Sequence, residues 1–189
     1  MPKIIPDIRA AAIAAVRRRV AVRGRRALEI RSLAASCGVA AGTLYNYFPS
    51  RDAIAAAAIR EDWLEATRRL QTFREGSSAM ENLRAVHGEL VGFMRRYRTL
   101  WSDAAGNQDR KGGNEVGAEL RRILEELDRI VDRAIGEQRA AGSIDAAFLR
   151  KFISRALVQW AQDPRVSWPM LSGIVGRLIG GNRSQKTHA

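Results

Sequence analysis

The chain has 189 residues, of which 46% are hydrophobic and 28% are charged, a balance typical of one folded domain or of two small ones that share a core. No apolar run approaches the roughly 18 residues needed to span a bilayer, and residues 1–6 lack the apolar core of a secretory signal. With a single cysteine, Cys37, and only His87 and His188 as histidines, the chain has no internal disulfide and little material for metal or nucleophilic chemistry. We therefore expect a cytoplasmic protein that is not an enzyme, with no metal, no cofactor and no membrane partner.

The net charge of +12 is concentrated near the N-terminus. Residues 1–51 contain ten basic and two acidic side chains, so this quarter of the chain carries eight of the twelve excess positive charges. A basic segment of this density suits a polyanion, either nucleic acid or an anionic membrane surface. On charge alone, the alternative is an arginine-rich solvated surface with no such partner.

Apolar residues recur at three- and four-residue steps along almost the whole chain, which predicts an all-α fold. Before a breaker at 76–78, helices are expected over 8–24, 30–37, 40–48 and from Ser50, a predicted N-cap, to about Phe73. After it, helices are expected from Met80 through Trp101, from Val116 to a stop at Gly142, over 148–160 and over 168–178. Residues 106–114 are predicted to form a loop, and residues 180–189 a polar tail.

Residues 30–48 predict two short helices joined by a tight turn. Ala34 is small enough to permit close packing between the helices, and Gly38 can adopt the left-handed backbone that a sharp turn needs. The apolar seam between the helices is formed by Leu33, Val39, Leu44 and Phe48. This pattern is typical of a helix-turn-helix, whose second helix lies in the DNA major groove.

The second of these helices has one apolar and one polar side. At about 100° per residue, Ala41, Leu44 and Phe48 point inward. The predicted DNA-facing residues are Gly42, Thr43, Tyr45 and Asn46, with Tyr47 at the flank. Thr43 and Asn46 can address base edges, while the tyrosines can contact phosphates or thymine methyl groups. A helical hairpin with no DNA role is the alternative, and the adjacent basic segment disfavours it.

Residues 8–60 resemble the N-terminal domain of the TetR (tetracycline-repressor) family of bacterial transcriptional regulators. The resemblance rests on two strings, LAASCGV at 33–39 and GTLYNYFPSRD at 42–52. It implies about nine helices, with a helix-turn-helix DNA-binding domain over 1–49 and a ligand-binding and dimerisation domain over 50–189. It also implies backbone phosphate contacts from Arg51, and from Arg31 where Glu29 replaces the usual Ser or Thr. Ala40 and Ala41 depart from the family's usual phosphate-binding residues.

The resemblance further implies a small-molecule pocket and a helical dimer interface in the C-terminal part. Candidate ligand contacts are Trp63, His87, Phe93, Met94, Tyr97 and Trp101, although aromatic and methionine side chains at helical spacing are also typical of an ordinary core. Candidate dimer contacts are Phe152, Leu157, Trp160, Trp168 and Leu171.

The function predicted from the sequence is that of a ligand-responsive transcriptional regulator. We expect a repressor that binds a palindromic operator as a homodimer and is released by a small-molecule effector. The alternative is a DNA-binding architectural or division-linked factor with the same domain and no effector. Its partners would be double-stranded DNA, a second copy of the chain and the effector, in the nucleoid of a bacterial cytoplasm.

Overall fold

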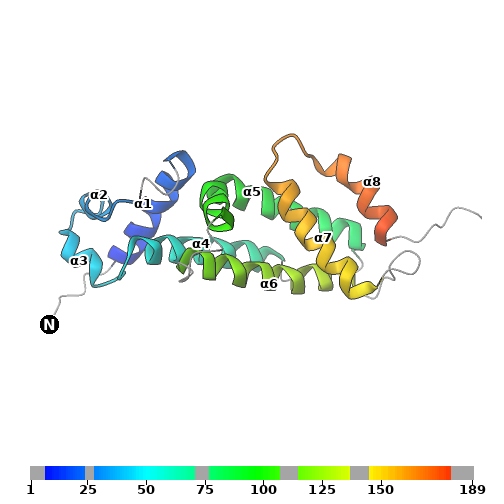
Figure 1. Cartoon of the computed structure of the whole chain (residues 1–189), viewed down its shortest axis with the longest axis horizontal. Coiled ribbons are helices and arrows are strands. Elements are labelled where there is room, and N and C mark those ends of the chain that lie inside the picture. The colour runs from blue at the N-terminus through cyan, green and yellow to red at the C-terminus, as the bar shows by residue number, and fades with distance from the viewer. Residues whose placement is uncertain (1–6, 24–27, 71–76, 107–114, 137–144, 180–189) are drawn as a thin grey trace, which may run out of the picture. The chain divides into compact units, whose positions relative to one another are not determined.

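The computed structural model describes residues 7–23, 28–70, 77–106, 115–136 and 145–179, and every regular element within these residues is a helix (Figure 1). In chain order the helices are α1 (Ile8–Arg23), α2 (Ile30–Ser36), α3 (Ala41–Tyr45), α4 (Arg51–Leu70), α5 (Ala79–Gly106), α6 (Glu115–Ile135), α7 (Ala146–Ala161) and α8 (Trp168–Ile179). The all-α prediction is confirmed, with eight helices in the described part of the chain where about nine were expected. None of these helices is long and apolar enough to cross a bilayer.

Helix α3 is shorter than predicted, since only Ala41–Tyr45 of the expected 40–48 is α-helical. The backbone tightens after Tyr45, because the amide of Asn46 donates to the Thr43 carbonyl at 3.2 Å and the amide of Tyr47 donates to the Leu44 carbonyl at 3.1 Å. Pro49 disfavours helical geometry at Phe48, and the chain leaves the helix over the preceding residues.

Several predicted boundaries lie outside the described residues. They are the end of the fourth helix near Phe73, most of the predicted loop at 106–114, the stop at Gly142 and the tail at 180–189. The predicted N-cap of the fourth helix is confirmed, because Ser50 Oγ accepts a hydrogen bond of 2.9 Å from the Ala53 amide.

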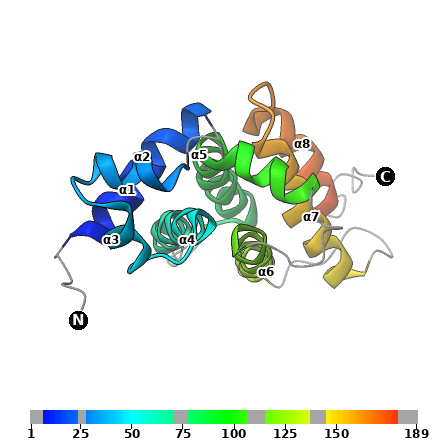
Figure 2. The same cartoon turned by 60° about the vertical axis from the view of Figure 1, so that its left-hand side comes forward.

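The described residues belong to two compact units. Unit 1 contains those of 1–65 and 95–122, and unit 2 contains those of 66–94 and 123–189, so α4, α5 and α6 contribute to both. In unit 1, α2 packs on α1 and α3 packs on α2 (Figure 2). The buried side chains of these three helices include Ile13, Val16, Leu33 and Leu44.

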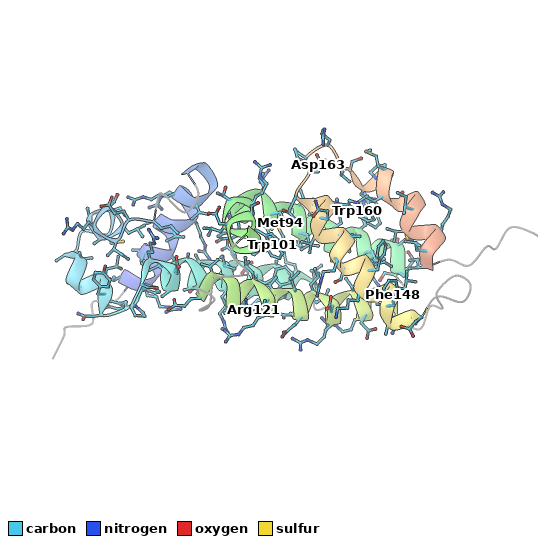
Figure 3. The ribbon with its side chains drawn as sticks, in the orientation of Figure 1. Met94, Trp101, Arg121, Phe148, Trp160 and Asp163 are labelled. Carbon is cyan, nitrogen blue, oxygen red and sulfur yellow. The ribbon has the colours of Figure 1, made fainter. Side chains whose placement is uncertain are left out.

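In unit 2, α7 and α8 lie side by side and are joined by a short turn that contains Asp163 (Figures 1 and 3). Leu157 of α7 and both Leu171 and Val175 of α8 are buried. Helix α7 begins at a side-chain cap, two residues before the predicted start, because the Asp145 carboxylate accepts a hydrogen bond of 2.7 Å from the Phe148 amide.

Candidate nucleic-acid interface

The turn between α2 and α3 has the geometry predicted from the sequence. Gly38 has a φ of +69°, in the left-handed region that favours glycine. Around it, the Gly38 amide donates to the Ala35 carbonyl and the Val39 amide donates to the Ala34 carbonyl, each at 3.1 Å. Backbone hydrogen bonds thus close the turn, as they do at many helix C-termini, and α3 begins directly after it.

The apolar seam beneath α3 is also confirmed. Leu33, Leu44 and Phe48 are buried, and Val39 is half-buried. The Arg9 guanidinium of α1 lies over the Phe48 ring, 5.4 Å from its centroid, which adds a cation–π contact between α1 and the segment after α3. These contacts hold α3 in place from one side only and leave its other side open.

The open side of α3 carries the side chains expected to read DNA. Asn46 and Gly42 are exposed, and Tyr45 keeps 52% of its surface accessible. Thr43 and Tyr47 are half-buried at the edges of this face. The face is therefore uncharged and polar, and a side chain such as Asn46 can form paired hydrogen bonds with an adenine edge in a major groove.

Two exposed arginines precede and follow this face in the sequence. Arg31, at the start of α2, is exposed, and the side chain of Arg51, at the start of α4, is 55% exposed, with its Nε 4.0 Å from Asp52 Oδ1. Both guanidinium groups are thus accessible to phosphate oxygens. Their predicted contacts with DNA remain predictions.

One positioning contact was not predicted from the sequence. Arg19 of α1 donates to both the hydroxyl and the backbone carbonyl of Ser32 on α2, at 3.1 and 3.0 Å. Arg19 lies in a run of arginines that charge alone would assign to phosphates. The packing of α2 on α1 is needed to see that Arg19 forms hydrogen bonds within the protein.

The residues predicted to contact an effector are divided between the two units. Trp63, Tyr97 and Trp101 belong to unit 1, and His87, Phe93 and Met94 belong to unit 2. All are buried except Trp101, which is half-buried; Figure 3 labels Trp101 and Met94 on α5. Their role in ligand binding stays a prediction.

Two of these side chains have distinctive polar environments. The Tyr97 hydroxyl lies 3.1 Å from the Ala58 carbonyl and 2.9 Å from Asp62 Oδ2, and burial together with the Asp62 charge raises the pKa of the phenol. The His87 ring is buried against Trp168 with a centroid distance of 5.8 Å, and its Nε2 has no hydrogen-bond partner among the described residues. Burial lowers the pKa of His87 below its ordinary value and so favours the neutral imidazole.

The residues predicted for dimerisation differ in exposure. Leu157 and Leu171 are buried in unit 2, Trp160 and Trp168 are half-buried, and Phe152 keeps 48% of its surface accessible. Three further apolar side chains of α7 and α8 are more than 40% exposed, namely Phe148, Met170 and Ile174. We call Phe148, Phe152, Met170 and Ile174 the apolar face of α7 and α8.

The sequence did not single out three of these four residues for dimerisation, because both helices are apolar on two sides. Periodicity identifies the apolar positions but does not say which of them the neighbouring helices cover. The rings of Phe148 and Phe152 stack on each other at 6.5 Å, so they form one continuous surface at the start of α7, where Figure 3 labels Phe148.

The fold and the exposed face of α3 define the chain as an all-helical protein with a helix-turn-helix DNA-binding domain. Residues 12–58 match the family of bacterial regulatory proteins known as the tetR family. Residues 12–58 thus match the N-terminal domain of that family, and the resemblance drawn from the sequence is confirmed. No curated protein matches the sequence.

Solved structures extend the likeness to most of the chain. A transcriptional regulator from Rhodococcus sp. Rha1 has a TM-score of 0.67 at 17% identity and covers 86% of each chain. A putative TetR-family transcriptional regulator from Rhodococcus sp. has a TM-score of 0.62 at 20% identity over 93% of this chain and 100% of that one. FadR from Bacillus subtilis, in complex with stearoyl-CoA, has a TM-score of 0.61 at 20% identity over 92% of this chain and 98% of that one. The chain has the fold of TetR-family transcriptional regulators.

Proposed function

We propose that the protein is a transcriptional repressor that binds a palindromic operator as a homodimer and is released by a small-molecule effector. In this proposal residues 1–49 bind DNA, and residues 50–189 bind the effector and the second copy. The observation that carries the proposal is the exposed, uncharged face of α3, in the most basic segment of the chain, with the exposed arginines Arg31 and Arg51 before and after it in the sequence. Neutral polar groups suit base edges, while arginines suit the phosphates on either side.

The apolar face of α7 and α8 supports a homodimer. Four large apolar side chains exposed on two neighbouring helices resemble one half of a helical interface rather than a finished surface. A two-fold dimer would present two copies of α3, and helix-turn-helix dimers bind half-sites roughly 34–36 Å apart. This geometry explains why a palindromic operator is expected.

Release by an effector rests on the predicted contacts, five of which lie on α5. Among them, His87 offers a buried nitrogen that lacks a hydrogen-bond partner in the described part of the chain, and such a group can recognise a polar atom of an otherwise apolar ligand. A thermal-shift screen of metabolites and drugs tests this part, because a ligand that binds the folded state raises the melting temperature. Stearoyl-CoA belongs in the screen, since the FadR structure contains it. If no compound stabilises the protein, the effector-free factor becomes the better description.

DNA binding is tested by selecting bound duplexes from a random library with the full-length protein. We expect a palindromic consensus, and an affinity that falls with salt with a log–log slope of about −0.9 per phosphate contact. The variant Arg31→Ala/Arg51→Ala should bind more weakly and with a shallower slope. Its matched control is Arg121→Ala/Arg129→Ala, which removes two exposed arginines from α6 and should leave both quantities unchanged. Failure to enrich any sequence, or a flat salt response, would overturn the proposal.

A further inference from the structure

Asp62 of α4 is the centre of a cluster of charged and polar side chains that joins three helices of unit 1. Its Oδ1 lies 2.6 Å from Arg17 Nε of α1. Its Oδ2 accepts a hydrogen bond from the Arg96 guanidinium of α5 and lies 2.9 Å from the Tyr97 hydroxyl of the same helix. One carboxylate therefore binds α1 on one side and α5 on the other.

The Asp62 side chain is only 10% exposed, whereas the side chains of Arg17 and Arg96 are 35% and 47% exposed. A carboxylate withdrawn from water needs its ionic partners more than an exposed one does, since few water molecules can replace them. The neighbouring Glu61 is 40% exposed and lies 3.8 Å from Arg9 and 3.5 Å from Arg17, at longer range than the Asp62 contacts. Asp62 is thus the more buried and the more closely paired of the two acids at this junction.

Toward the helix-turn-helix, α1 is connected to α2 by side-chain contacts. Two residues after Arg17, Arg19 holds Ser32 of α2 through two hydrogen bonds, and α2 packs on α3. The position of α3 is therefore linked to Asp62 through contacts that are each present in unit 1.

On the other side, Arg96 and Tyr97 lie on α5, the helix that carries five of the six predicted effector contacts. The sixth, Trp63, directly follows Asp62 in α4. Arg96 donates a hydrogen bond to Asp62, and this bond raises the pKa of the guanidinium. A displacement of this part of α5 would alter two of the contacts that Asp62 makes.

We propose that Asp62 is the positioning residue that couples α5 to the DNA-binding helices α1–α3, through its simultaneous contacts with Arg17, Arg96 and Tyr97. The proposal rests on the proposed function and names the regulation of the same DNA-binding face. When α5 holds Arg96 and Tyr97 on Asp62, the carboxylate is fixed and orients Arg17 and α1. When α5 withdraws them, Asp62 is freed and α1 loses its fixed orientation.

The first test uses Asp62→Asn, with Asp128→Asn as its matched control. Asp128 of α6 also binds an arginine across two helices, with Arg155 of α7 at 2.8 and 3.0 Å, but it lies in unit 2. At a temperature where circular dichroism shows both variants folded, Asp62→Asn should reduce affinity for the selected operator by about tenfold without changing the consensus. Asp128→Asn should lower the melting temperature and leave the affinity unchanged. Equal affinity losses in the two variants, or none in Asp62→Asn, would overturn the proposal.

The second test is a double-mutant cycle between Arg17→Ala and Arg96→Ala, read as operator affinity. Because both arginines bind one carboxylate, their effects should be non-additive, and this non-additivity should vanish in the Asp62→Asn background. A direct phosphate contact of Arg17 would weaken binding but would not generate coupling to Arg96. Additive effects with Asp62 present would contradict the proposal.

A third measurement needs no DNA. Amide hydrogen exchange of Arg96→Ala should increase in residues 8–20 and 30–36, although the substitution lies on α5, and should stay unchanged in 146–161. An increase confined to α4 and α5 would overturn the coupling. If the native chain selects no operator, the proposed function fails, while this measurement still decides whether Asp62 links α5 to α1.

Discussion

Asn46 is the exposed polar side chain of the α3 face that is best suited to base readout. Replacing it with alanine removes a paired hydrogen bond to a base, so Asn46→Ala should cost about 1–3 kcal/mol of discrimination at one operator position. Affinities for operators mutated one position at a time measure this. Arg51→Ala is the comparison and should weaken every duplex alike, because a phosphate contact carries no sequence information. If Asn46→Ala keeps the native consensus, α3 is oriented differently from our proposal.

We expect His87 to make the stability of the protein depend on pH in the slightly acidic range. Burial lowers its pKa in the folded state below the ordinary value of 6.5, so the unfolded chain binds the proton more readily. The contribution to stability is present above pH 6.5 and is lost as the pH falls from there toward the folded-state pKa. Chemical denaturation of the native chain should therefore show falling stability between pH 7.5 and 5.5. The stability of His87→Leu should depend less on pH in this window. Parallel profiles for the two proteins would mean that the pKa of His87 is the same in the folded and unfolded states.

Local sequence patterns correctly predicted residues whose contacts are formed within one turn or one short helix. Gly38, Leu44 and the exposure of Asn46 follow from the spacing of residues within one turn and one short helix. The Asp62 cluster could not be found in this way, because Arg17 and Arg96 lie far from Asp62 in the sequence and on different helices. Nothing in the pattern distinguishes an arginine that binds an acid of the same chain from one that binds phosphate.

The turn between α2 and α3 depends on one left-handed residue. A β-carbon at Gly38 meets no atom within 4 Å, so the cost of Gly38→Ala is the left-handed backbone itself, about 1–2 kcal/mol of unfolding free energy. The control is Gly88→Ala on α5, an exposed helical position with equally open space. That change should be neutral or stabilise by up to about 1 kcal/mol. Urea denaturation measures the free energy of unfolding of both variants. Equal changes in Gly38→Ala and Gly88→Ala would show that a side chain at Gly38 does not strain the turn.

The elements themselves were largely predictable, because caps and breakers are short-range signals. Ser50 was expected to cap α4 and does. Ser78 and Glu81 form a reciprocal capping box at the start of α5 that the same reasoning could have found, with the Ser78 amide 2.7 Å from the Glu81 carboxylate and the Glu81 amide 3.2 Å from Ser78 Oγ. The early end of α3 was not predicted, since a proline says that a helix must stop but not how many residues earlier it does.

For the whole molecule, the apolar face of α7 and α8 predicts self-association. Phe152→Asp places a charge on this face and should convert a dimer into a monomer in sedimentation equilibrium, with operator affinity reduced at least about tenfold because one half-site is lost. Val91→Asp is the control, since Val91 is also an exposed apolar residue, on α5. If the native chain is already a monomer, or if both variants dissociate alike, this face is not the dimer interface.

The fold class of the whole molecule could be predicted from the sequence, whereas its exposed apolar surfaces could not. Helical periodicity gave the all-α fold, and residues 33–39 and 42–52 gave the family of the N-terminal domain. Which side of α7 and α8 remains open depends on how their neighbours pack, and that is a property of the tertiary structure.

Helix α3 is only five residues long, and its N-cap, Ala40, makes no side-chain hydrogen bond. A segment this short has no helical stability of its own in water and depends on the burial of Leu44 and Phe48 beneath it. We therefore expect warming to loosen the exposed face of α3 before the rest of the protein melts. The difference in affinity between operator and random duplex should narrow several degrees below the melting temperature, while attraction to the phosphate backbone persists.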